Sequence, residues 1–362
     1  MTPAPDGIGS ASERAIVRTA VLLLLAILIA ATASWSVLAL AVAGTSDEAV
    51  RTSLAATVAL ISLATLGGLC VPRWRWHALA AYCVLFAAVL LWWRSITPSN
   101  YRDWQPDVAQ LATATIDGNL VTVHHIRNID YRSETDYTPA YYDKRFDLRQ
   151  LEGVDLVAVY WMGPAIAHVF LSFAFTDDSH LAISIETRKE KGEAYSTLKG
   201  FFRQYELYYV VADERDVIRL RTNYRHDPPE DVYLYRVTGS VDHARRLFLE
   251  YMNQINALTT RPEFYNSLTT NCTTNIWLNS RVNPTHLPFS WKILASGYVP
   301  EFLYEHGRLD SRGQSFSTLR QQAYINPRAH AADNAADFSR RIRRDTLALT
   351  KDNAAAVTRN EP

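Results

Sequence analysis

The sequence predicts an α+β protein in which N-terminal transmembrane helices precede a domain built on an antiparallel sheet. Residues 20–43 carry no charged side chain and are long enough to cross a bilayer as a helix. Segments 168–175 and 181–188 alternate in side-chain character with a period of two, which is typical of β-strands. Apolar residues recur at helical spacing from Val241 to Leu258, so helices and strands both belong to the domain.

The membrane segment is predicted to contain three spans within residues 20–93. Apolar stretches at 53–71 and 78–93 follow the first. A cleavable signal peptide is the alternative for the first stretch, with Arg14 and Arg18 as its basic region. The apolar run continues to Ala43, beyond any cleavage site near Ala31, and this favours a spanning helix.

The basic residues beside these spans predict the orientation, because loops rich in Lys and Arg stay in the cytoplasm. Four arginines fall on one side of the membrane: Arg14, Arg18, Arg73 and Arg75. The loop on the other side contains Asp47 and Glu48 beside Arg51. We therefore predict a multi-pass protein of the cytoplasmic (inner) membrane. Its N-terminus (1–19) lies inside, and its soluble domain lies in the periplasm or outside.

The soluble part divides into a folded domain at 100–325 and a tail at 326–362. The tail is rich in Ala, Arg and Asp with almost no large apolar residues, so we expect it to be disordered. The 37 basic and 37 acidic residues of the whole chain cancel, which argues against a nucleic-acid partner. No Cys/His zinc spacing or glycine-rich phosphate loop is present, and the sequence predicts neither a metal nor a cofactor.

Cys272 is the one cysteine of the soluble part, because Cys70 and Cys83 lie in apolar runs. A run of Thr and Asn leads into Ile276 and Trp277, which predicts a helix start beside the thiol. The partial positive charge at a helix N-terminus favours a thiolate, which is the nucleophilic form of cysteine. A buried structural cysteine is the alternative. Chemistry is favoured because an unpaired thiol is a liability in an oxidising compartment.

A polar patch is predicted on the hairpin formed by 168–175 and 181–188. Opposed residues of an antiparallel pair share a face, so the polar residues of the two strands must coincide. We expect His168 to lie opposite Arg188, with Glu186 diagonal to His168 and within reach of it. An imidazole, a carboxylate and a guanidinium would then share one patch.

The region from about Arg127 to Asp310 resembles the Lnb N-terminal periplasmic domain family. The resemblance rests on motifs in a fixed order: Arg-Asn-Ile-Asp-Tyr-Arg at 127–132, Ala-His at 167–168, Ile-Glu-Thr-Arg at 185–188, Gly-Glu at 192–193, Gln-Tyr-Glu-Leu at 204–207, Glu-Arg-Asp at 214–216, Arg-Thr-Asn at 221–223 and Asn-Cys-Thr at 271–273. The fold it implies is a permuted papain-like (NlpC-type) domain, in which a strand His precedes the helix-borne Cys.

The resemblance implies Cys272 as nucleophile, His168 as base and Glu186 as the carboxylate that orients the base. The candidates for contact with the oxyanion or the reacting group are Asn271 and Thr273. His180 is the reserve orienting residue. Ion pairs to Glu186 are expected from Arg188 or Arg215.

The implied activity is acyl transfer or hydrolysis on a lipid-linked, lipoprotein-like substrate through a Cys272 thioester, at the outer face of the cytoplasmic membrane. A cell-wall peptidase or amidase is the first alternative. A non-catalytic, membrane-anchored module that binds a partner is the second.

The predicted orientation can be tested with a cysteine placed in the tail near Ala331. We expect Ala331→Cys to react with a membrane-impermeant thiol reagent in intact cells, in a chain whose other three cysteines are Ser. The cysteine-free chain is the control. Labelling that requires cell lysis would place the domain on the cytoplasmic side.

Overall fold

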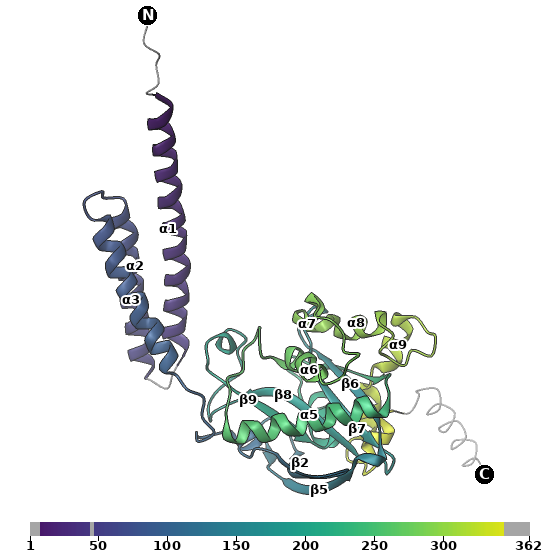
Figure 1. Cartoon of the computed structure of the whole chain (residues 1–362). Helices are drawn as coiled ribbons and strands as arrows, with labels where there is room; N and C mark the ends of the chain where they lie inside the picture. The colour runs from purple at the N-terminus through teal and green to yellow at the C-terminus, as the bar shows by residue number, and fades with distance from the viewer. Residues whose placement is uncertain (1–7, 44–46, 344–362) are drawn as a thin grey trace, which may run out of the picture. The chain divides into compact units, whose positions relative to one another are not determined.

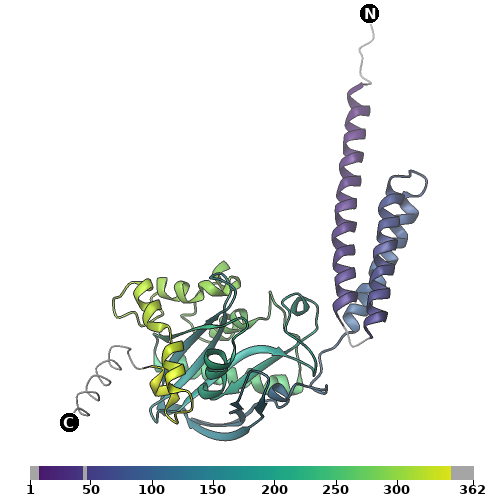
Figure 2. The same cartoon turned by 180° about the vertical axis from the view of Figure 1, so that it is seen from behind.

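A computed structural model describes residues 8–43 and 47–343, which fall into two compact units (Figures 1 and 2). One unit holds the chain as far as Pro98 together with Ser196–Gln204, and the other holds Ser99–Tyr195 and the chain from Tyr205 onward. Apolar helices come first, followed by a sheet domain with helices. The predicted α+β class is therefore confirmed.

Three helices occupy the predicted apolar stretches, and each is long and apolar enough to cross a membrane. They are α1 (Ile8–Val42), α2 (Glu48–Leu69) and α3 (Arg75–Ser95). The carboxylate of Asp47 caps α2 by accepting a hydrogen bond from the Ala49 N–H at 2.8 Å. These helices anchor the chain in the membrane.

The helices pack through small side chains and satisfy their polar groups among themselves. Ala39, Ala43 and Ala55 are buried in the contacts, where small residues let helices approach closely. The Tyr82 hydroxyl lies 2.7 Å from Thr32 Oγ1 and donates to the Ile29 carbonyl at 3.2 Å. No polar atom of this pair is left for the lipid to satisfy.

The segment Ser196–Gln204 belongs to the helical unit although it lies far along the chain. Phe202 is buried in a cluster with Ala39 and Ala43, and its ring lies 6.2 Å from that of Trp93. The Arg203 guanidinium donates to the Trp93 carbonyl at 2.8 Å. This short segment is thus fixed to the ends of the helices by one apolar and one polar contact.

The second unit is built on an eight-stranded sheet in the order β1-β2-β9-β8-β7-β6-β10, with β5 paired to β2. All its pairings are antiparallel except β2 with β9, so the sheet is mixed, and the prediction of an antiparallel sheet holds apart from this one pairing. The strands are β1 (Thr113–Asp117), β2 (Leu120–Arg127), β5 (Tyr141–Asp147), β6 (Leu151–Tyr160), β7 (His168–Phe175), β8 (His180–Arg188), β9 (Glu206–Ala212) and β10 (Asp231–Val237). Two short strands, β3 (Asp130–Tyr131) and β4 (Tyr137–Thr138), form a separate pair.

Helices cover both faces of this sheet. On the face that carries Leu171 and Ile183 lie α5 (Val241–Thr260), α6 (Cys272–Ser280), α7 (Trp291–Leu294), α8 (Val299–Glu305) and α9 (Phe316–Ala323). On the face that carries Phe170 and Ala182 lie α4 (Glu214–Arg219), a π-helical turn η4 (Leu220–Tyr224), α10 (Asn326–Ala332) and α11 (Phe338–Arg341). The alternation predicted for β7 and β8 therefore separates two apolar cores.

The register of β7 and β8 corrects the predicted pairing. Ala174 lies opposite His180, and Leu171 lies opposite Ile183. Continued along the strands, this register sets His168 opposite Glu186 rather than Arg188. The polar residues of the two strands do share a face, as predicted. The loop closes one residue earlier on each strand than expected, and this shifts the register by two residues.

The prediction of disorder from residue 326 is wrong for the residues described, which extend to 343. α10 and α11 bury Ile325, Ala329 and Phe338 against the Phe170 face of the sheet. A few apolar side chains are sufficient because an existing sheet face supplies the partner surface. Residues 344–362 lie outside the described part.

Arg343 secures this C-terminal region to two buried carboxylates. Its guanidinium lies 2.7 Å from Asp155 and 2.6 Å from Glu214. Burial raises the pKa of Glu214, but the charge and hydrogen bonds of Arg343 have the larger, opposite effect. The net result is a pKa of about 2. Removal of the arginine would leave the buried Glu214 without its guanidinium partner and Asp155 with Arg236 alone.

We expect Arg343→Met to lower the free energy of unfolding by about 3–5 kcal/mol. Arg340→Met is the matched control and should leave unfolding nearly unchanged, because Arg340 pairs with Asp337 at the surface. Thermal unfolding of the detergent-solubilised chain measures both. Because the folded pKa of Glu214 is depressed, the stabilisation is complete above its unfolded value near 4.3 and is lost as the pH falls toward 2. Equal midpoints for the two variants would contradict the role of Arg343.

Candidate active site

Asn271 and Thr274 fix the start of α6 through reciprocal hydrogen bonds. Asn271 Oδ1 accepts from the Thr274 N–H at 2.9 Å, and Thr274 Oγ1 accepts from the Asn271 N–H at 2.9 Å. This capping box satisfies two N–H groups that a helix start leaves without partners. Cys272 is therefore the first helical residue, as the sequence predicts.

The Cys272 sulfur lies in a buried environment rich in hydrogen-bond donors, with 7% of the residue exposed. Burial raises the pKa of the thiol, but the charge of His168 and a hydrogen bond from it lower it. The backbone N–H groups of Val169 and Thr273 also donate to the sulfur and lower the pKa further. The net direction is down, so the surroundings stabilise the thiolate.

His168, the first residue of β7, is the partner of this thiolate. Its Nε2 lies 2.6 Å from Ser184 Oγ, which leaves Nδ1 as the ring nitrogen for Cys272. Burial lowers the pKa of His168, and so does Arg221. The negative charge on Cys272, the hydrogen bond to it and the hydrogen bond to Glu186 outweigh both, and the net pKa is raised. The opposite directions of the two pKa shifts mean that each residue stabilises the charged form of the other.

A chain of hydrogen bonds runs from His168 to a buried arginine. Ser184 Oγ donates to Glu186 Oε1 at 2.7 Å, and the same carboxylate oxygen lies 3.5 Å from His168 Nε2. Arg221 Nη2 donates to Glu186 Oε1 at 2.9 Å from the π-helical turn η4. Burial raises the pKa of Glu186, but Arg221 and His168 lower it well below its ordinary value. The carboxylate is thus held ionised beside the imidazolium.

The structure brings Cys272, His168 and Glu186 together, but not the two arginines expected to pair with Glu186. Arg188 points to the carbonyls of Val108 and Ala109 and lies 4.3 Å over the Trp104 ring. The two-residue shift of the register moves it away from His168. Arg215 lies on α4 and has no hydrogen bond or ion pair to Glu186 in the described part of the chain. Arg221 takes the role predicted for both.

His180, the reserve orienting residue, lies at the other end of the hairpin. It pairs with Ala174 next to the hairpin loop, whereas His168 lies at the opposite end of β7. Its Nδ1 lies 3.0 Å from the Asp178 carbonyl. This leaves Glu186 as the carboxylate next to His168.

The side chains of Asn271 and Thr273 are already used in the helix cap. The Asn271 amide donates to the Ser267 carbonyl at 2.9 Å, and the Thr273 hydroxyl donates to the Ile293 carbonyl at 2.6 Å. The predicted contact with an oxyanion therefore falls to the Cys272 N–H, because the N–H groups of Asn271 and Thr274 belong to the cap and that of Thr273 donates to the sulfur.

Ser184 and Arg221 are the two residues of this cluster that sequence reasoning missed. Ser184 lies two residues before Glu186 on the same face of its strand, so the alternation that identified Glu186 pointed to it as well. Arg221 belongs to the Arg-Thr-Asn motif, but its contact with Glu186 joins residues 35 positions apart. No local pattern encodes that contact.

Asp155, His180 and Glu214 form the acidic and histidine cluster that could hold a metal ion, with ligand atoms within 4.8 Å of one another. Arg343 donates to both carboxylates, and Arg236 pairs with Asp155 at 2.7 Å. The two guanidinium groups neutralise the charge that a cation would need. The cluster is better described as a salt-bridge network.

The fold and the site define a membrane-anchored α+β domain with a buried Cys–His pair and a carboxylate behind it. The family model of the Lnb N-terminal periplasmic domain matches residues 137–297. This range includes Cys272 and His168 and the hydrogen-bonded residues behind them, Ser184, Glu186 and Arg221. This family is the one that the sequence resembles, and its description names a periplasmic domain. No curated protein matches the chain, and no solved structure does.

The thiolate can be detected by its reactivity. We expect iodoacetamide to alkylate Cys272 with an apparent pKa below the roughly 8.5 of a free cysteine, so that the reaction persists as the pH falls below that value. His168→Ala should raise the apparent pKa, because the imidazolium is the largest favourable influence on the thiolate.

Mass spectrometry of the peptide that contains Cys272 separates this reaction from those of Cys70 and Cys83. His180→Ala is the matched control and should leave the profile unchanged. An ordinary thiol profile in the wild-type protein would contradict the ion pair.

Proposed function

We propose that this domain is a cysteine-dependent acyltransferase or hydrolase that acts on lipid-linked acyl groups through a thioester on Cys272. The observation that carries the proposal is the arrangement of a buried Cys272 at the start of α6 and His168, whose ring is linked through Ser184 to Glu186 and Arg221; the pKa of Cys272 is lowered and that of His168 is raised there. A thiolate beside an imidazolium supplies both the nucleophile and the acid that an acyl-transfer step requires. The family resemblance points to the same chemistry.

In the first step the Cys272 thiolate attacks the acyl carbonyl carbon, and a C–S bond forms while the carbonyl oxygen becomes an oxyanion. The Cys272 N–H at the start of α6 would donate to that oxygen. The tetrahedral intermediate then expels the alcohol portion of the ester. His168 gives its proton to the departing oxygen, and the acyl group remains on sulfur.

In the second step an acceptor attacks the thioester carbon. Neutral His168 takes a proton from the acceptor, and the C–S bond breaks to return the thiolate. Water as acceptor gives hydrolysis, and an amine gives transfer to nitrogen. The imidazolium and thiolate are regenerated, so protons and charge balance over the cycle.

Ser184, Glu186 and Arg221 support this cycle without touching the reacting atoms. Ser184 lies 2.6 Å from His168 Nε2 and directs Nδ1 toward the sulfur. The ionised Glu186 stabilises the imidazolium, and Arg221 keeps Glu186 ionised. They are positioning residues.

Apolar side chains at the surface near His168 favour a lipid over a peptide substrate. Met162 and Ile166 are exposed in the loop that leads into His168. Trp291 is 61% exposed in α7, and the adjoining loop is joined to the first by the Gly297 N–H, which donates to the Ala165 carbonyl at 3.0 Å. Exposed apolar groups of this kind mark contacts with lipids or other apolar partners. The cell-wall peptidase reading has no comparable support.

The test compares wild type with Cys272→Ser and Glu186→Gln in purified membranes. Cys272→Ser should fold and insert normally because the change is nearly isosteric, but it should lose activity because a hydroxyl is much harder to ionise than a thiol. Glu186→Gln should reduce activity and shift its pH profile, because the imidazolium loses its ionised neighbour.

The substrates are a diacylated lipopeptide and, separately, muropeptides, with products followed by mass spectrometry. Deacylated or acyl-shifted lipopeptide made by wild type alone would support the proposal, whereas cleaved muropeptide would support the peptidase. A binding module would give neither product. It would also form no hydroxylamine-labile adduct on Cys272, and Cys272→Ser would then fully complement a deletion.

A further inference from the structure

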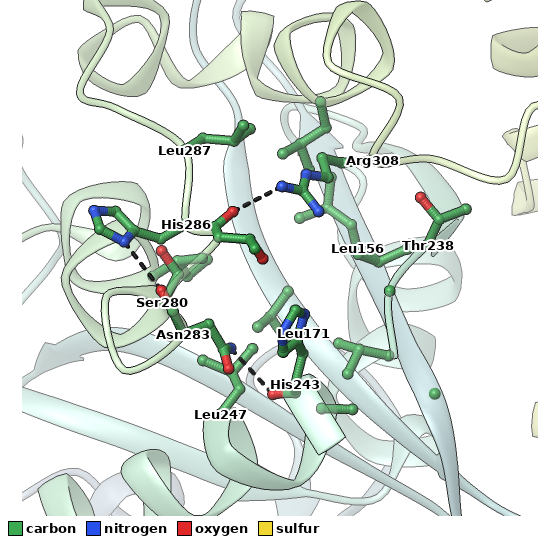
Figure 3. A pocket seen from close by; sticks show the side chains of 18 of the residues that line it. Leu156, Leu171, Thr238, His243, Leu247, Ser280, Asn283, His286, Leu287 and Arg308 are labelled. Carbon is green, nitrogen blue, oxygen red and sulfur yellow. Dashed lines mark hydrogen bonds between the residues drawn. The ribbon is translucent and has the colours of Figure 1, made fainter. Parts of the chain in front are cut away.

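A cavity of about 240 Å³ lies beside the catalytic helix, between α5, α6, the loop 281–290 and α8 (Figure 3). Its wall includes Leu156 and Leu171 from the sheet, Leu247 from α5, Ile293 from α7 and Phe302 from α8. Artificial apolar cavities of about 150 Å³ stay dry and bind benzene. This cavity is therefore large enough for a small apolar group.

The apolar part of the wall is deeply buried, and several polar side chains of the lining, Thr273 among them, are already held by hydrogen bonds to backbone carbonyls. Leu156, Leu171 and Ile293 are almost fully buried. At the rim, Arg308 donates to the Thr285 carbonyl at 2.7 Å, and Asn283 donates to the His243 carbonyl at 3.1 Å (Figure 3). An occupant that places amide groups inside would leave them unsatisfied, which costs roughly 1–3 kcal/mol for each group. The mainly apolar wall therefore favours a hydrocarbon.

The cavity adjoins the site of Cys272 along two elements. Thr273, the residue next to the nucleophile, is part of its lining. On β7 the Val169 N–H donates to the sulfur, and Leu171, the next residue on the same face, lines the cavity. Two residues of strand span about 7 Å. A chain attached through its carbonyl carbon at the sulfur therefore needs only a few carbon atoms to reach the cavity.

We propose that this cavity binds the hydrocarbon tail of the acyl group carried by Cys272. The proposal rests on the function proposed above. It adds where the hydrocarbon part of the acyl group binds and predicts a preference for acyl groups of a certain length. The acetyl group is too short to reach the cavity, whereas longer linear chains bury methylene groups there. Each buried methylene should raise the rate of acylation about fourfold until the cavity is full.

The first test measures the rate at which Cys272 becomes acylated by p-nitrophenyl esters from acetyl to dodecanoyl, with the acyl-enzyme followed by intact-protein mass spectrometry. Ala244→Trp fills the cavity from α5, and Asn253→Trp places the same ring on an exposed position of the same helix. We expect Ala244→Trp to preserve acetylation and to lose the gain with chain length. Asn253→Trp should behave like wild type.

Rates that are independent of chain length in the wild type, or that fall equally for acetyl and octanoyl in Ala244→Trp, would overturn the proposal. If Ala244→Trp does not fold, Ser280→Phe at the edge of the cavity replaces it.

The second test does not depend on catalysis. The full-length Cys272→Ser chain in nanodiscs is irradiated with a fatty acid that carries a diazirine near its methyl end, and the labelled peptides are mapped. Labels in 241–247 or 276–287 that disappear in Ala244→Trp support the site, even if no ester acylates the wild type and the proposed function fails. Labels confined to other parts of the chain would overturn it.

Discussion

The contact between Cys272 and His168 is the interaction on which the functional architecture depends. Each residue is the first of its element, α6 or β7, so the pair forms only where the two elements begin side by side. The Asn271–Thr274 cap fixes one start, and the Val169 N–H that donates to the sulfur fixes the other. Because neither group would keep its charge alone in a buried place, each stabilises the charge of the other.

The same constraint explains the row of polar groups behind the histidine. A buried imidazolium next to Arg221 would lose its proton without a compensating negative charge, and Glu186 supplies it. Arg221 in turn keeps Glu186 ionised and also lies 3.3 Å from Glu230. The charges therefore alternate from the thiolate to the arginine. Removal of one member changes the protonation of its neighbours, which is the behaviour of a coupled network rather than of separate ion pairs.

The sheet serves two different tasks on its two faces. On the Leu171 face it lines a mainly apolar cavity beside α5 and α6, next to Cys272. On the Phe170 face it carries the C-terminal helices, which Arg343 fixes to Asp155 and Glu214. Strand alternation makes this possible, because adjacent residues of β7 point to opposite faces. Cys272 and His168 meet at the end of β7, where both faces are within reach.

The sequence by itself determined the features that depend on local periodicity: the three apolar helices, the α6 start at Cys272, and the alternation that put His168 and Glu186 on one face. It also identified the family through ordered motifs. Only the tertiary structure decided the register of β7 and β8, the choice of Arg221 over Arg188 and Arg215, and the order of the C-terminal helices. Local patterns report which face a side chain takes. Loop closure and the packing of distant segments decide which partner it meets there, and those energies belong to pairs of residues far apart in the chain.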